Sequence, residues 1–277
     1  MNAGDMGAVA AADGKKMNRT MIRLQGLWRT VLVHTVAGVV PYYVVNEYPK
    51  SGGTWLGQML SRALDVPFPR HRMPLLRRSV MHGHHLHPTG MRNTVVLWRD
   101  GRDVTVSWYY HCLFRSERTH PSLVEENRRA LGFADCEDIR TNLPRFIEYL
   151  FERQRHPGFS WTRFVDAWRD RPGVLYTSYE ALRADGAGEL ARLANALASD
   201  TLTRERAAGI VDAFSFERMA GRRVGQENIH SFLRKGVVGD WVNVFDREAR
   251  QLFHHYAGPA LVALGYEHDD AWVEDAP

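Results

Sequence analysis

The residues most able to do chemistry lie in the stretch NEYPKSGGTW, residues 46–55. Backbone N–H groups of a glycine-containing turn can form a concave nest for an anion. Lys50 adds a mobile positive charge, and the hydroxyl of Thr54 lies where the N-terminus of a following helix attracts anions. The nucleotide loop G-x-x-x-x-G-K-[ST] instead has its lysine after the second glycine and a hydroxyl on Mg²⁺. The pattern predicts an anion site of another kind, although a plain strand-to-helix turn fits K-S-G-G equally well.

Two later segments also combine positively charged side chains with a hydroxyl or a glycine that an anion could approach. RDGRDVTVSWYYH begins at Arg99, at the end of an apolar run, and reaches Ser107 eight residues on. A phosphate could bind between this guanidinium and hydroxyl, because arginine matches phosphate geometry. FLRKGVVGDWVNVF (232–245) sets Arg234 and Lys235 beside Gly236. Taken alone, each segment is better explained as ordinary surface, with an exposed arginine or a basic turn.

The elements around these segments predict an α/β fold. Apolar, β-branched runs in PYYVVNEYP, at 94–98 and in GVLYTSYE (173–180) predict strands, and residues 54–64, 104–113 and 180–199 have helical spacing. Asp103 is the expected N-cap of the second helix. Alternating strands and helices predict one P-loop-like parallel sheet with helices on both faces, a single domain over 1–277. Ligands of such sheets bind beyond the carboxyl ends of the strands, where two of the three segments lie.

The rest of the chain gives weaker signals. Residues 114–172 read as helices and loops, HGHHLH (82–87) as a polar loop, and 247–266 as an amphipathic helix broken or bent near Gly258-Pro259. Residues 1–18 are expected to be disordered. The apolar stretch 30–45 is too short and too interrupted for a membrane span. We expect this stretch to pack against the rest of the protein rather than to form a peripheral amphipathic helix on a membrane.

Composition narrows the class of protein. The chain has 277 residues, 44% of them hydrophobic, a net charge of +4 and a pI near 9.2, which suits an anionic ligand without requiring one. Two cysteines outside a C-x-x-C pattern favour a reducing compartment, and we expect a cytoplasmic protein. No basic–aromatic platform for nucleic acid is evident.

Together the three segments resemble the signatures of the cytosolic sulfotransferases that use 3′-phosphoadenosine-5′-phosphosulfate (PAPS). The family patterns Y-P-K-S-G-T-T-W and R-K-G-x-x-G-D-W-K-N-x-F correspond to YPKSGGTW and RKGVVGDWVNVF, and the middle signature corresponds to Arg99 through Ser107 followed by WYY. The three patterns occur in the family's order, over roughly 44–245. The resemblance implies transfer of a sulfuryl group from PAPS to a hydroxyl or amine, with PAP as product and no metal.

The resemblance also implies residue roles. Lys50 would contact the oxygen that bridges phosphate and sulfate, where it could replace the magnesium used in phosphoryl transfer. Arg99 and Ser107 would hold the 3′-phosphate. Tyr179 would lie near the adenine, whereas the contact of the FSF stretch is in doubt because Phe214 replaces a threonine. The other implied donor-site residues are Ser51, Gly52, Gly53, Thr54, Trp55, Ser215, Phe216, Arg234, Lys235 and Gly236.

A general base is needed for the acceptor proton, and histidine suits this role near neutral pH. Aligning the family's K-T-H with HGH makes His84 the base, with His85 a close second because the register can slip. His82 then replaces a lysine, and Gly53 replaces a threonine. A metal site in this histidine run is the less favoured reading.

The acceptor is a small molecule, lipid or glycan with a hydroxyl, and the sequence does not choose among them. Loops 68–93, 109–160 and 217–233 would form its pocket, with aromatics at Phe68, Tyr109, Tyr110, Phe114, Tyr149 and Trp161. The family's C-terminal dimer motif is not recognisable. A nucleotide-dependent kinase, which would need a G-K-[ST] that is not found, and an inactive PAP-binding protein remain alternatives.

Overall fold

The structure is a computed structural model and describes residues 19–70, 76–153, 157–198 and 201–274. The expectation of disorder over residues 1–18 lies outside these ranges. A parallel sheet forms the centre, in the order β2–β1–β3–β4. Its strands are β1 (Tyr42–Glu47), β2 (Ser79–Gly83), β3 (Thr94–Trp98) and β4 (Leu175–Ser178). The predicted α/β fold with a parallel sheet is confirmed.

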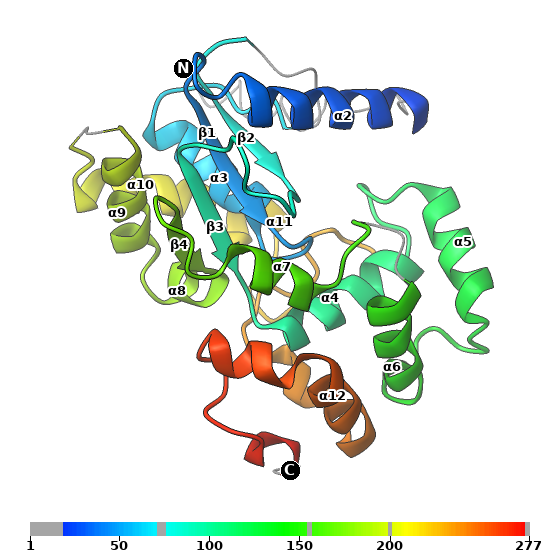
Figure 1. The fold of residues 1–277 in the computed structure, drawn as a ribbon. Coiled ribbons are helices and arrows are strands. Elements are labelled where there is room, and N and C mark those ends of the chain that lie inside the picture. Colours follow the sequence, from blue (N-terminus) through cyan, green and yellow to red (C-terminus); the bar gives the residue numbers. More distant parts are fainter. Residues whose placement is uncertain (1–18, 71–75, 154–156, 199–200, 275–277) are drawn as a thin grey trace.

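Helices cover both faces of the sheet, because successive side chains of a strand point to opposite sides. Tyr43 and Val45 of β1 pack against α3 (Gly53–Ala63) and α9 (Gly186–Ala198). Tyr42 and Val44 instead pack against α2 (Arg19–Thr35). Figure 1 shows α3, α9 and α10 on one side of the strands, with α2 along the upper edge of the view.

The second large apolar cluster joins β3 to the helices at the carboxyl end of the sheet. Val96 and Trp98 belong to it, together with side chains of α4, α6, α7 and α12. The remaining helices are α4 (Gly101–Leu113), α5 (Pro121–Leu131), α6 (Ile139–Glu148), η1 (Tyr149–Arg153), α7 (Trp161–Trp168), α8 (Tyr179–Ala184), α10 (Arg204–Ala213), α11 (Phe216–Ala220), η2 (Asp240–Asn243), α12 (Arg247–Ala263) and η3 (Ala271–Val273).

Strand β2 corrects the expectation of a polar loop for the first two residues of the histidine run, His82 and Gly83, whereas residues 84–87 lie outside any helix or strand. It pairs in parallel with β1, with Val45 opposite His82. Four of its five residues are buried, and His82 is 7% exposed. The short sequence SVMHG has no clear β pattern, so pairing with β1 rather than local propensity determines the strand.

Helix α4 begins earlier than expected, and its cap is a different aspartate. Asp100 is the N-cap, and its side chain accepts a hydrogen bond from the backbone N–H of Arg102 at 2.9 Å. The prediction of Asp103 as N-cap was therefore wrong. Asp103 lies inside the helix and is 1% exposed. Its carboxylate accepts hydrogen bonds from the backbone of Gly239 and Trp241, far along the chain.

The C-terminal helix is not broken at Gly258-Pro259. Helix α12 runs without interruption from Arg247 to Ala263 and contains Pro259. A proline removes one helical hydrogen bond, but buried residues on both sides of it, Ala257 and Leu261, anchor the helix in the core. Within the described residues, no helix combines the length and apolar character needed to cross a bilayer.

Candidate active site

The loop between β1 and α3 has the shape of an anion nest. Lys50 and Gly52 both have left-handed backbone, with φ of 77° and 107°. Gly52 is required there, because a side chain would be strained at this φ and its Cβ would lie 3.0 Å from the Tyr179 ring. Helix α3 starts immediately after, at Gly53, so the N-terminus of the helix adjoins this loop.

One pocket brings the three sequence segments together. Of the fifteen residues proposed from sequence, twelve line it: Lys50, Gly52, Gly53, Thr54, Trp55, Arg99, Ser107, Tyr179, Phe216, Arg234, Lys235 and Gly236. Three do not: Ser51, Ser215 and His84. Ser51 is buried beneath the loop, and Ser215 instead caps α11 by accepting from the N–H of Arg218.

Lys50 lies in an unusual electrostatic environment. Its Nζ is 4.1 Å from the centre of the Phe232 ring, and its carbonyl oxygen accepts a hydrogen bond from Arg99 at 2.9 Å. Burial, reinforced by the nearby Arg99 charge, lowers the pKa of Lys50 to about 7. Lys50 is therefore only partly protonated at neutral pH, and a bound anion would favour its protonated form.

Asp103 joins the second segment to the third. Its carboxylate accepts hydrogen bonds from the backbone N–H groups of Gly239 at 2.8 Å and Trp241 at 3.1 Å. It also lies 3.8 Å from Arg99. These contacts fix the RKGVVGDW segment against α4, so the two predicted 3′-phosphate segments are positioned by one buried carboxylate.

The cations of the third segment are held by acidic partners. Lys235 Nζ lies 2.6 Å from Asp240, and Arg234 pairs with both Asp240 and Glu227. The Arg234 guanidinium also lies 4.5 Å from the centre of the Tyr110 ring. Pairing and stacking reduce the side-chain freedom of both cations before a ligand arrives.

Glu47, which sequence reasoning missed, forms a compact unit with two residues that depart from the family pattern. Its carboxylate accepts the N–H of Gly53, and its Oε1 lies 2.9 Å from His82 Nε2. Burial favours the neutral acid, but the His82 hydrogen bond and neighbouring imidazoles outweigh it and lower the Glu47 pKa. A Cβ at residue 53 would lie 2.6 Å from the Glu47 carboxyl carbon and 2.7 Å from His82 Nε2. Glycine is therefore required at residue 53 because Glu47 and His82 occupy the space that a side chain would take.

Introducing threonine at Gly53 is expected to lower the free energy of unfolding by about 1–3 kcal/mol, because the added side chain overpacks this unit. Urea unfolding measures the change. In the Glu47→Ala background the loss should be smaller, since the clashing carboxyl is gone, so the two effects should not add. Gly209→Thr is the matched control, because that glycine has open space around it. Additive losses in the double variant would contradict the packing argument.

The candidate bases lie beside this unit. His84 Nδ1 is 2.9 Å from the carbonyl oxygen of Glu47. A carbonyl oxygen only accepts, so Nδ1 carries the proton, and in the neutral ring Nε2 is the basic nitrogen. His85 is buried, and desolvation lowers its pKa to about 3. Its Nε2 is buried with no hydrogen-bond partner among the described residues.

Glu47, His82 and His84 each place a potential ligand atom within 4.8 Å of the others. Two imidazoles and a carboxylate are a donor set that zinc accepts. Both oxygens of Glu47 already have protein partners, Gly53 N and His82 Nε2. The carboxylate is therefore satisfied without an ion.

Other residues line the pocket that sequence reasoning did not name. The Phe232 ring makes cation–π contacts with two side chains. One is Lys50, and the other is Arg118, whose guanidinium lies 4.5 Å from the ring centre. Phe214, whose contact was in doubt, also lines the pocket, and its carbonyl oxygen accepts from Trp55 Nε1 at 2.9 Å. Phe232 directly precedes LRKG. This position beside a segment already predicted to bind phosphate could have identified it as a pocket residue from the sequence. The remaining unpredicted lining residues are Gln58, Arg183, Met219, Leu233 and Val237.

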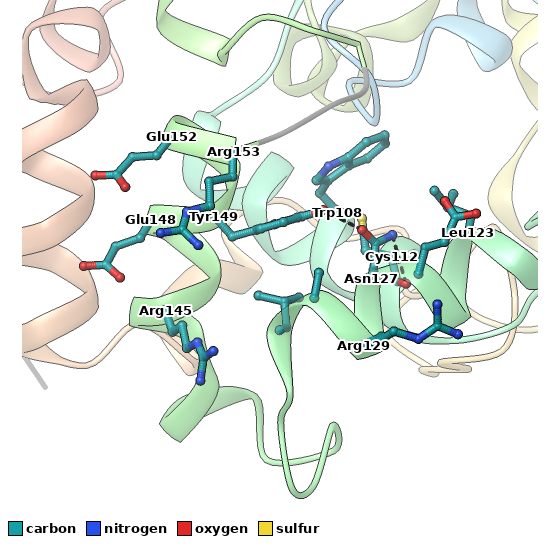
Figure 2. Close-up of a pocket in the computed structure, with 13 residues that line it drawn as sticks. Trp108, Cys112, Leu123, Asn127, Arg129, Arg145, Glu148, Tyr149, Glu152 and Arg153 are labelled. Atoms are coloured by element: carbon teal, nitrogen blue, oxygen red, sulfur yellow. Dashed lines mark hydrogen bonds between the residues drawn. The ribbon is translucent and has the colours of Figure 1, made fainter.

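A second, larger pocket of about 720 Å³ lies between α4, α5 and the α6–η1 region. In Figure 2 the Tyr149 side chain reaches from η1 across to the facing helices. Its hydroxyl donates to Asn127 at 2.8 Å. Trp108 and Cys112 of α4 line the pocket. Carboxylates and guanidiniums are mixed along the other walls, at Glu126, Arg129, Arg145, Glu148, Glu152 and Arg153.

Of the six aromatics expected to face an acceptor, only Tyr149 lines this second pocket. Tyr109, Phe114 and Trp161 are at most 4% exposed and belong to the core. Tyr110 packs against that core, and Phe68 packs against the α3 and α9 cluster. Aromatic side chains satisfy a core as readily as a ligand pocket, and the sequence does not distinguish the two.

Comparison with known proteins gives a consistent result. The family model described as "Sulfotransferase domain" matches residues 73–265. Human sulfotransferase 1E1 is 25% identical over 260 residues, which cover 77% of this chain and 81% of the relative. Mouse sulfotransferase 1B1 is 27% identical over 257 residues, with 76% and 79% covered.

Solved structures share the fold. Mouse sulfotransferase SULT7A1, complexed with PAP, superimposes with a TM-score of 0.53 at 19% identity and covers 85% of this chain and 89% of its own. Retinol dehydratase, in a complex with retinol and PAP, gives 0.51 at 18% identity, with 88% and 86% covered. Since the family model spans well over half of the residues, the chain belongs to the sulfotransferase family.

Proposed function

We propose that this chain transfers a sulfuryl group from PAPS to a hydroxyl or amine of its acceptor. The observation that carries the proposal is the single pocket lined by twelve residues from the segments that match the family signatures. All three segments contribute cations to its lining: Lys50, Arg99, and Arg234 with Lys235. Several cations in one pocket suit a ligand with two phosphate groups, and PAP is such a ligand.

In the proposed reaction the acceptor oxygen attacks the sulfur in line with the bond to the bridging oxygen. His84 accepts the acceptor's proton through Nε2, while its Nδ1–H donates to the Glu47 carbonyl oxygen. The bridging oxygen leaves with PAP, and the Lys50 ammonium stabilises the charge that develops on it. His85 is disfavoured as the base, because a pKa of about 3 gives it little basicity near neutral pH.

The acceptor is proposed to enter through the second pocket. Trp108 and Cys112 line that pocket from α4, the helix that also presents Ser107 to the donor pocket. Apolar walls with mixed charges around them suit a small amphipathic molecule with a hydroxyl. The two free cysteines, Cys112 and Cys136, agree with the cytoplasm as the proposed compartment.

Thermal unfolding tests the donor site. PAP without magnesium should raise the melting temperature by several degrees, because a ligand at 100 times its Kd adds about 2.7 kcal/mol to stability. AMP, which lacks the 3′-phosphate, should give a smaller shift, and ATP with Mg²⁺ none. A shift with ATP–Mg²⁺ and none with PAP would restore the kinase alternative. After a PAP shift, PAPS with a panel of hydroxyl acceptors would identify the class.

A further inference from the structure

Helix α2 has an apolar face that no described residue covers. Leu24, Leu27, Trp28 and Val31 are 55%, 63%, 44% and 39% exposed. Their spacing of three, one and three residues puts them on one side of the helix. A surface helix of a globular protein normally turns such a stripe toward the core. We call these four side chains the outer stripe of α2.

The outer stripe is not a core face that failed to pack, because α2 has a second apolar face that is packed. Leu32 and Val33 are 2% and 0% exposed and lie against Tyr42, Val44 and Met81 of the sheet. The end of the helix is also fixed by His34, whose Nδ1 lies 2.6 Å from the carbonyl oxygen of Thr89. Figure 1 shows α2 lying along the edge of the molecule, above β1 and β2. The stripe is therefore presented outward on an anchored helix.

The charge of this part of the chain indicates what covers the stripe. Between Asp13 and Glu47 the sequence contains no acidic residue, and it places Arg19 and Arg23 in the first two turns of α2, whereas Arg29 is half-buried and faces away from open solvent. Anionic lipid headgroups attract such a basic segment, and leucine and tryptophan are favoured at the bilayer interface. A second copy of the chain would bring like charges together in a symmetric contact, which opposes dimerisation through this face.

We propose that the outer stripe of α2 docks the protein on an anionic membrane surface. The leucines and Trp28 would enter the headgroup region, and the basic segment would supply the attraction to anionic lipid. The helix would lie in the plane of the interface, as expected for an amphipathic segment that does not span the bilayer. This inference concerns a face outside the donor pocket and does not depend on the proposed reaction.

Vesicle flotation with the full chain tests the proposal. The protein should float with vesicles of phosphatidylcholine and phosphatidylglycerol, should not float with phosphatidylcholine alone, and should be released by added salt. The Leu27→Ser/Trp28→Ser variant should bind the anionic vesicles at least about tenfold more weakly, because two large apolar side chains no longer leave water. Val262→Ser is the matched control, since Val262 is 40% exposed on α12, and it should bind normally. Unchanged melting curves would show that each variant is folded.

Four results would overturn the proposal. Absence of binding to anionic vesicles is the first, and equal binding by the double variant and the parent protein is the second. The third is a dimer without lipid that the double variant converts to a monomer, because a second copy would then cover the stripe. Vesicle binding seen only after removal of residues 1–18 would also count against it, since that segment would be the natural cover.

Discussion

Replacing His84 with glutamine should lower the turnover number for sulfuryl transfer by about 10²–10⁴-fold, the usual contribution of a positioned general base. Glutamine keeps a hydrogen-bonding side chain of similar size but cannot accept the acceptor's proton. PAP affinity should be unchanged, because His84 does not line the donor pocket. Steady-state kinetics with PAPS and any accepted hydroxyl compound, together with PAP titration, measure the two quantities separately.

Two neighbouring histidines provide the controls for this result. His87→Gln changes an exposed residue and should leave turnover unchanged. His85→Gln changes a buried ring beneath the site and should affect stability more than turnover. Full activity in His84→Gln combined with a large loss in His85→Gln would show that the register of the family alignment is displaced by one residue.

Replacing Lys50 with methionine should lower the turnover number by about 10²–10³-fold, since the variant loses the charge that stabilises the leaving oxygen. The same ammonium should make PAP binding depend on pH. In the free protein burial and Arg99 lower the Lys50 pKa to about 7, and a bound phosphate should raise it again.

The sign of the pH effect follows from these two pKa values. Below pH 7 Lys50 is protonated with or without PAP, so it adds no pH dependence. Above pH 7 the free protein has lost the proton and the complex retains it, so PAP affinity should fall by up to about tenfold per pH unit. At pH 8, where phosphate groups are already ionised, calorimetry in buffers of different ionisation enthalpy should detect uptake of up to one proton.

Lys235→Met is the matched control for Lys50→Met. It removes an ammonium from the same pocket, so PAP should bind more weakly, yet the proton uptake should persist because Lys50 is still present. Loss of uptake in Lys50→Met alone assigns the proton to Lys50. If Lys50→Met took up as many protons as the parent protein, the titrating group would lie elsewhere in the pocket.

By itself, the sequence determined the parts of this protein that depend on local patterns. The β-branched run before Lys50, the helical spacing from residue 54 and the cations beside Gly236 are each readable over a dozen residues. The order of these segments also identified the family. Because parallel strands end on the same edge of a sheet, the meeting of the loops after β1 and β3 followed from the pattern as well.

The tertiary structure decided what depends on contacts between distant residues. His82 lies in a strand only because β1 pairs with it, and Pro259 stays within α12 because the core holds the helix on both sides. Asp103 was the predicted cap of α4, but Asp100 caps the helix, and Asp103 instead accepts from the N–H groups of Gly239 and Trp241. Gly53 and Glu47 are six residues apart and are joined by a direct hydrogen bond, but the contact of Glu47 with His82 becomes visible only when the strands are paired. Local propensity is encoded within a few residues, whereas these choices depend on which buried polar groups and apolar faces meet after folding.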